Sequence, residues 1–133
     1  MVKGSCLCGS VAFSLTGKMR DIIACHCTQC RKQSGHFWAA TSVAERDLNL
    51  ESKKGLTWFR ASDKINRGFC ENCGSTLFYK PDAEARIVVS AGCLENGSGL
   101  NISRHAFIAD KGDYYEIADD LPTHDQFTGI ENE

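Results

Sequence analysis

The sequence predicts an all-β protein: short strands in packed antiparallel sheets, little helix, and a four-cysteine zinc site that staples the sheets together. Three observations favour this fold class. No long segment of the 133 residues has the periodicity of an amphipathic helix. Short segments rich in β-branched and aromatic residues are separated by Gly, Asn and Asp, as strands are by turns. The eight cysteines, far above average usage, lie mostly in tight clusters of the kind that bind metal.

Each predicted strand is short, and several alternate apolar with polar side chains, as a half-buried strand does. In Val11–Leu15, for example, Val11, Phe13 and Leu15 point to one face. Glycines between the segments provide the turns. In chain order, the predicted strands cover residues 11–15, 56–59, 76–79, 87–89, 106–108 and 114–117.

One helical turn is predicted at Thr28–Ser34, where Gly35 would end it. The last residues, 123–133, are polar, and we expect this tail to fray. Two separate cores would leave each half of a 133-residue chain near the lower limit of stability. We therefore expect one zinc-binding β-domain over residues 1–133.

Composition and charge exclude several classes of protein. Hydrophobic residues make up 42% and charged residues 24%, which excludes a disordered or fibrous chain. The formal net charge of −2, without a Lys/Arg cluster, argues against nucleic-acid binding. No apolar run approaches the roughly 20 residues that cross a bilayer, and the first residues lack the apolar stretch of a signal peptide. We therefore expect a cytoplasmic protein that binds neither nucleic acid nor membranes.

Seven of the eight cysteines fall into three clusters, named here the first pair (Cys6, Cys8), the cysteine trio (Cys25, Cys27, Cys30) and the second pair (Cys70, Cys73). Structural disulfides are uncommon in a reducing compartment, and bonds that close such short loops would constrain the unfolded chain little. Tight clusters instead gather thiolates around one ion, so we expect metal rather than disulfides. The eighth cysteine, Cys93, is expected to be a small buried residue at the end of a strand.

The two pairs can together complete a closed, structural zinc site. On an extended backbone, residues i and i+2 point the same way, so Cys6 and Cys8 present two sulfurs to one side. Cys70 and Cys73 have the spacing of a metal knuckle, and Gly74 eases the turn. Either spacing allows the sulfur separation of about 3.8 Å that a tetrahedral zinc requires. Such a site has no position for a substrate and contributes to folding.

The cysteine trio predicts a different kind of site. Three thiolates within six residues cap one face of a tetrahedron and leave one corner open. Three protein ligands with an open position are typical of a reactive zinc rather than a structural one. The clustered cysteines thus divide naturally into four plus three.

Spacing alone leaves other assignments open. A zinc ribbon could join Cys27 and Cys30 to the second pair, which would leave the first pair and Cys25 unused. The trio could also recruit Cys93 or a histidine and become a second closed site. A redox role for the Cys-x-x-Cys at 27–30 is disfavoured, because a thioredoxin-type motif needs a strand–helix–strand setting that this sequence lacks.

Four stretches follow one another in the order of a known family. They are GSCLCGSV at 4–11, CHCTQCR at 25–31 with Ser34-Gly35, RGFCENCGS at 67–75, and HAF at 105–107 with DDLP at 119–122. On these motifs, which cover about 4–122, the sequence resembles the glutathione-dependent formaldehyde-activating enzyme family, which includes centromere protein V. The ordered set is highly specific, whereas a single knuckle is common to many zinc proteins.

The resemblance implies a partition of the cysteines. It implies that Cys6, Cys8, Cys70 and Cys73 hold a structural zinc and that Cys25, Cys27 and Cys30 hold a reactive one, two ions per chain. It also implies an all-β fold. The family's founding activity joins formaldehyde to glutathione as S-hydroxymethylglutathione and is classed with the carbon–sulfur lyases.

Three further residues are candidates for a role in the reaction. Glutathione is an anion, so its carboxylates need cations: Arg31 and Lys32 adjoin the trio, and Lys64 and Arg67 precede the second pair. Arg31 is the first candidate because of its position, and Arg67 is the second. His26, between two proposed ligands, is a candidate proton shuttle whose side chain we expect to point away from the metal. The alternative for each is a packing or surface role.

The predicted function is that of a zinc-dependent carbon–sulfur lyase-type enzyme, glutathione-dependent and formaldehyde-activating. It would act on adducts of glutathione, or a related thiol, with small aldehydes, because a metal-coordinated thiol is deprotonated and held beside the aldehyde. The alternative is a non-catalytic, zinc-stabilised module that binds a protein partner.

Overall fold

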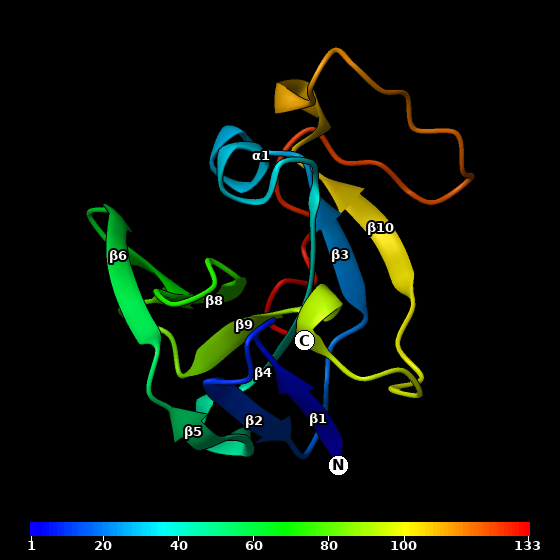
Figure 1. The fold of residues 1–133 in the computed structure, drawn as a ribbon. Helices are drawn as coiled ribbons and strands as arrows, with labels where there is room; N and C mark the ends of the chain where they lie inside the picture. Colours follow the sequence, from blue (N-terminus) through cyan, green and yellow to red (C-terminus); the bar gives the residue numbers. More distant parts are fainter.

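The computed structural model describes residues 1–133 and confirms the all-β fold class: ten strands in two sheets, with one α-helix and three short 3₁₀ helices. The small sheet has the order β1-β2-β5 and is antiparallel. Figure 1 places it at the opposite end of the molecule from α1 (Thr28–Ser34). Its strands are β1 (Val2–Ser5), β2 (Val11–Leu15) and β5 (Leu48–Lys53).

The large sheet has seven strands in the order β10-β3-β4-β9-β8-β7-β6. Neighbours pair antiparallel except β10 and β3, which run parallel. No helix is long and apolar enough to cross a membrane. The strands are β3 (Ile22–Cys25), β4 (Trp38–Ala44), β6 (Leu56–Ser62), β7 (Ile65–Cys70), β8 (Thr76–Pro81), β9 (Arg86–Ser90) and β10 (Ile102–Ala106).

The main core lies between the two sheets. Val11, Phe13 and Leu15 of β2 are completely buried on one face, as their alternation predicts. They pack against buried side chains of β4, β8 and β9 in one cluster. The rings of Phe13 and Phe78 meet edge to face with centroids 5.3 Å apart, a geometry that stabilises aromatic pairs.

Several predicted elements match the structure. β2 and α1 have the predicted bounds, and β6, β8 and β9 extend the predicted segments by one to three residues at their ends. Gly35 ends the helix in the left-handed conformation, with φ 89°, and its N–H donates to the carbonyl of Arg31. The sequence pattern missed β1, β3, β4, β5 and β7, and all of β10 except Ala106.

Two predicted strands are wrong. The segment 106–108 is not a strand, because β10 ends at Ala106 and Phe107 has a positive φ of 56°. The segment 114–117 is not a strand either; its aromatic side chains instead pack beside His36 and His26. The tail expected to fray is held against the sheet, since Thr123 bridges to His105 and the carbonyl of Gln126 accepts from Phe107.

Candidate metal centres and the adjoining cavity

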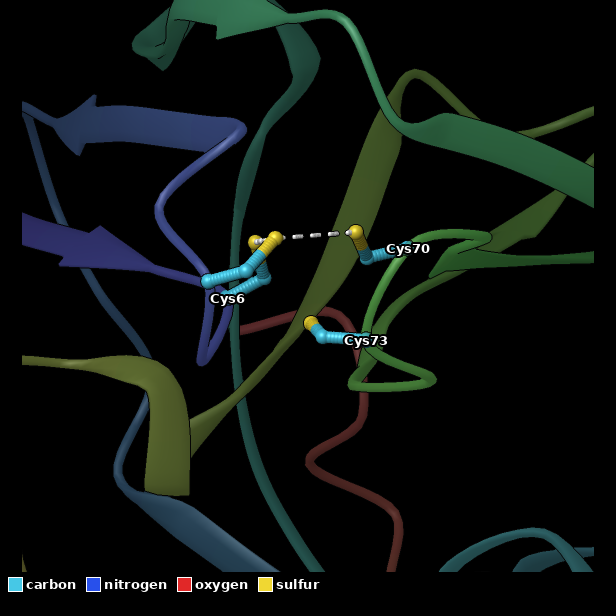
Figure 2. A group of neighbouring side chains, drawn as sticks. Cys6, Cys70 and Cys73 are labelled. Carbon is cyan, nitrogen blue, oxygen red and sulfur yellow. Dashed lines mark hydrogen bonds between the residues drawn. The ribbon is translucent and has the colours of Figure 1, made fainter.

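The structure brings the first and second pairs together as one four-cysteine cluster. All four sulfurs lie within 4.8 Å of one another. The sulfur of Cys8 is 3.7 Å from that of Cys6 and 3.7 Å from that of Cys70. Figure 2 shows the sulfurs of Cys6, Cys70 and Cys73 facing a common centre. These separations match the edge of about 3.8 Å expected for a tetrahedral zinc with Zn–S bonds of about 2.3 Å, so the cluster can hold a metal ion.

Each pair lies in a tight turn that ends in a glycine. Gly9 and Gly74 have φ values of 81° and 79°, and their N–H groups donate to the carbonyls of Cys6 and Cys70. The role expected for Gly74 is therefore confirmed. The first pair is not extended as expected, because Cys8 lies in a turn after β1, and this turn brings both sulfurs to the cluster.

Two serines that sequence reasoning missed lie among the sulfurs. The hydroxyl of Ser10 is 3.2 Å from the sulfur of Cys8 and 3.3 Å from that of Cys70. The hydroxyl of Ser75 is 3.2 Å from the sulfur of Cys73 and accepts a hydrogen bond from the N–H of Leu7. The thiol of Cys8 donates to the Ser10 hydroxyl, and outer-shell hydrogen bonds of this kind orient the sulfurs of a metal site. The only signal for them is their position two residues after a cysteine.

The cysteine trio forms at the junction of β3 and α1. Cys25 ends β3, Cys27 is the N-cap of the helix, and Cys30 lies in its first turn. The N–H of Cys30 donates to the sulfur of Cys27 at 3.3 Å, so the capping interaction itself turns the sulfurs toward one another. All three sulfurs lie within 4.8 Å of one another, which is compatible with one metal ion.

The ionisation of the three thiols in the trio also favours binding of a cation. Hydrogen bonds from Cys25 and then Cys30 lower the pKa of the Cys27 thiol. Hydrogen bonds with Cys27 and then Cys30 raise the pKa of Cys25, so its thiol keeps its proton. Three thiols this close cannot all ionise unaided, so binding all three as thiolates requires a positive ion.

The sulfurs therefore group as four plus three, and the alternative groupings do not form. No fourth cysteine, histidine or carboxylate joins the trio. Cys93 lies in the 3₁₀ helix Ala91–Cys93 and its thiol donates to the carbonyl of Thr76. All eight cysteines are free thiols.

A cavity of about 410 Å³ adjoins the trio, and just over half of its lining residues are hydrophobic. Cys25, Cys27 and Cys30 all line it, together with Trp38 and Tyr79. The lining also includes two arginines, Arg86 of β9 and Arg20 of the segment before β3. Burial lowers the pKa of Arg20 to about 10, which leaves it charged at neutral pH.

Arg67 lines the cavity beside the thiols. It comes from β7 and is only 3% exposed. Its Nη2 lies 3.5 Å from the sulfur of Cys30, and its Nε donates to the side-chain oxygen of Gln29 at 3.0 Å. Arg31, the other candidate, donates from Nε to the carbonyl of Asp110 and does not line the cavity.

His26 is fully buried and its ring points away from this cavity toward His105. Its Nε2 is 2.9 Å from His105 Nδ1, and the other nitrogen of His105 is 2.9 Å from the carboxylate of Asp119. Burial, with the neighbouring His105, lowers the pKa of His26 to about 4. Sequence reasoning missed Tyr115, whose hydroxyl lies 2.5 Å from His26 Nδ1.

The chain is similar to known proteins in sequence and in fold. The family model described as glutathione-dependent formaldehyde-activating enzyme matches residues 1–110. An uncharacterized lyase of Schizosaccharomyces pombe is 23% identical over 117 residues, which cover 87% of this chain and 85% of the relative. A crystal structure of a Rhodobacter sphaeroides protein has a TM-score of 0.57 and 24% identity, over 74% of this chain and 90% of that one. The likeness to the Rhodobacter sphaeroides structure shows that the two chains share a fold.

Proposed function

The chain belongs to the glutathione-dependent formaldehyde-activating enzyme family, and from that premise we propose that it is a zinc-dependent carbon–sulfur lyase-type enzyme. Its substrates would be adducts of glutathione, or of a related thiol, with small aldehydes, such as S-hydroxymethylglutathione. The lyase name of the yeast relative supports this class of reaction. A family fold alone does not determine an activity, so the proposal depends on the cysteine trio.

The observation that carries the proposal is the position of the trio in the wall of the cavity. Its three sulfurs face a common centre, have no fourth protein ligand, and line a space of about 410 Å³. A zinc ion held there would keep a substrate thiol ionised. No member of the four-cysteine cluster lines this cavity, so we propose a structural role for the metal of that cluster.

The chain's own residues would position the two reactants. Trp38 and Tyr79 give the cavity aromatic walls, which exclude water from the reacting atoms. The substrate sulfur forms a bond to the aldehyde carbon, the carbonyl electron pair moves to oxygen, and that oxygen takes a proton. The lyase direction reverses these steps. Of the two arginines expected to bind substrate, we propose Arg67 because it lies in the cavity.

The test compares Cys25→Ser with Cys93→Ser. We expect wild-type protein to hold two zinc ions and Cys25→Ser to hold one, as measured by elemental analysis. Exchange of formaldehyde with S-hydroxymethylglutathione, followed by NMR exchange spectroscopy, should fall to the uncatalysed rate in Cys25→Ser. Cys93 lies outside both clusters, and a serine can make the same hydrogen bond to Thr76, so the control should keep both properties.

Two outcomes would contradict the proposal. If Cys25→Ser loses one zinc ion while exchange remains fast, the trio is not the reactive site. If the wild-type protein with two ions never accelerates exchange, the alternative of a zinc-stabilised binding module is favoured.

A further inference from the structure

Arg67 is a buried cation without a carboxylate partner. Its guanidinium carbon lies 5.6 Å from the ring centroid of Trp38 and 5.0 Å from that of Tyr79, so two aromatic rings fix its position. None of the protein's ion pairs includes it. A charge this deeply buried normally has a carboxylate partner or a full set of hydrogen bonds.

The hydrogen-bonding groups of Arg67 are only partly used. Nε donates to Gln29, and Nη2 lies against the sulfur of Cys30. Nη1 is buried and has no partner. A guanidinium presents five N–H donors in a rigid plane, and a buried donor left unpaired costs free energy. The Nη1 edge therefore keeps donors that no protein group uses, in a guanidinium that contacts the thiols through Nη2.

We propose that Nη1 of Arg67 binds the reacting oxygen, namely the aldehyde oxygen that becomes the hydroxyl of the adduct. The proposal rests on the proposed function and adds the residue that recognises the aldehyde half of the substrate. In the adduct this oxygen is two bonds from sulfur. Because Nη2 contacts a sulfur of the trio and Arg67 lines the cavity, its guanidinium lies beside the space that the oxygen of a trio-bound adduct would occupy. Nη1 itself is covered by protein atoms, so it reaches that oxygen through a small side-chain shift on binding.

The chemical consequence is stabilisation of negative charge on oxygen. As the sulfur electron pair forms the carbon–sulfur bond, the carbonyl pair moves to oxygen, and Nη1–H donates to that oxygen until a proton arrives from water. A preorganised donor of this kind raises kcat by a factor of about 10²–10³. A guanidinium that bound only a distant peptide carboxylate would change the affinity for the thiol and leave this step unaltered.

The kinetic test uses Arg67→Met, which keeps the length of the stem, and Arg67→Lys, which keeps a charge without the planar fork. We expect both to retain two zinc ions and the circular dichroism spectrum of the wild type. Their kcat should fall about 100-fold, while KM for the thiol changes less than about threefold. Arg46→Met, at an exposed position, removes the same charge elsewhere and should leave both constants unchanged.

A binding test gives a readout that does not require turnover. S-acetylglutathione carries an oxygen two bonds from sulfur, and S-ethylglutathione has the same skeleton without it. We expect wild-type protein to bind the acetyl compound about tenfold more tightly in calorimetry, and Arg67→Met to lose this preference. If wild-type protein shows the preference but no exchange activity, the oxygen site stands and the proposed function fails.

Three results would overturn the proposal while leaving the proposed function intact. The first is equal affinity of active wild-type protein for the two compounds. The second is a raised KM for the thiol in Arg67→Met with kcat unchanged, which would assign the arginine to a carboxylate. The third is loss of zinc or of the folded structure in both Arg67→Met and Arg67→Lys, which would make the residue structural.

Discussion

His26 Nε2 lies 2.9 Å from His105 Nδ1 in the protein interior, although 79 positions separate the two residues. The contact is part of a string of four side chains, Tyr115–His26–His105–Asp119. If Asp119 accepts from Nε2 of a neutral His105, then His105 Nδ1 accepts from His26, and His26 Nδ1 accepts from the hydroxyl of Tyr115. The low pKa of His26, caused first by burial, agrees with this neutral arrangement.

Breaking this string should destabilise the fold without removing metal. His105→Leu leaves the buried Nε2–H of His26 without an acceptor, so we expect a loss of about 1–3 kcal/mol in the free energy of unfolding. The measurement is urea unfolding with zinc content determined in parallel. The double variant His26→Leu/His105→Leu should lose less than the sum of the two single variants. Strict additivity would show that the contact contributes nothing.

The four-cysteine cluster should be required for stability. Cys73→Ser removes one of its ligands, and we expect one zinc ion fewer and a fall in Tm of about 10 °C or more, because metal binding is coupled to folding. Cys93→Ser again serves as the control. Thermal unfolding by circular dichroism and elemental analysis check the result. An unchanged Tm after loss of that ion would rule out a structural role.

Gly55 allows the backbone to approach the cluster closely. A Cβ at this position would lie 2.6 Å from the hydroxyl of Ser10 and 2.8 Å from the sulfur of Cys70. Gly55→Ala should therefore displace Cys70 and the hydroxyl of Ser10. We expect the zinc ion of the four-cysteine cluster to pass to a chelator about 10–100-fold faster than in the wild type. Gly92→Ala is the matched control, since its nearest atom would be 4.0 Å away. Equal release rates in the two variants would contradict the expectation.

The corner between β6 and β8 should contribute a pH-dependent stabilisation. Hydrogen bonds from Arg60 and then Asn66 lower the pKa of Asp82 to about 2. Because the folded pKa lies below the ordinary value of 3.8, the stabilisation is complete above about pH 4 and is lost as the pH falls toward about 2.

Asp82→Asn removes this titration at nearly constant size. The difference in Tm between wild type and Asp82→Asn should be constant from about pH 8 to about pH 5 and shrink below about pH 4. High salt should also reduce it, because both partners are about half exposed. A difference that grew on acidification would contradict the assignment.

Local patterns predicted some elements well because the cause of each is local. β2 alternates because its apolar residues share the face that meets the core, and α1 lies between a capping residue and Gly35. β7 has no such pattern. The rings of Trp58 and Phe78 lie 3.1–3.2 Å from where a Cβ of Gly68 would be, so a glycine is required there by side chains of the neighbouring strands. The polar β10 was missed for a similar reason, since it packs beside β3 and the C-terminal segment.

The candidate site likewise has parts that local sequence predicts and parts that depend on how distant strands pair. The sulfurs of the trio come within reach because their spacing fits one strand end and one helical turn, so sequence predicts them. The contact of His26 with His105 depends on the parallel pairing of β10 with β3, which no local signal indicates. The burial of Arg67 likewise depends on the rings of Trp38 and Tyr79, which come from two other strands.

The long interval between the two halves of the four-cysteine cluster has a consequence for biosynthesis. Cys8 and Cys70 are 62 positions apart, so at about 5–20 residues per second a ribosome needs roughly 3–12 seconds to make the second half after the first. During that interval the nascent N-terminal segment carries two thiols that cannot yet close on their partners. Correct maturation therefore requires these thiols to stay reduced until translation has passed the knuckle at β7.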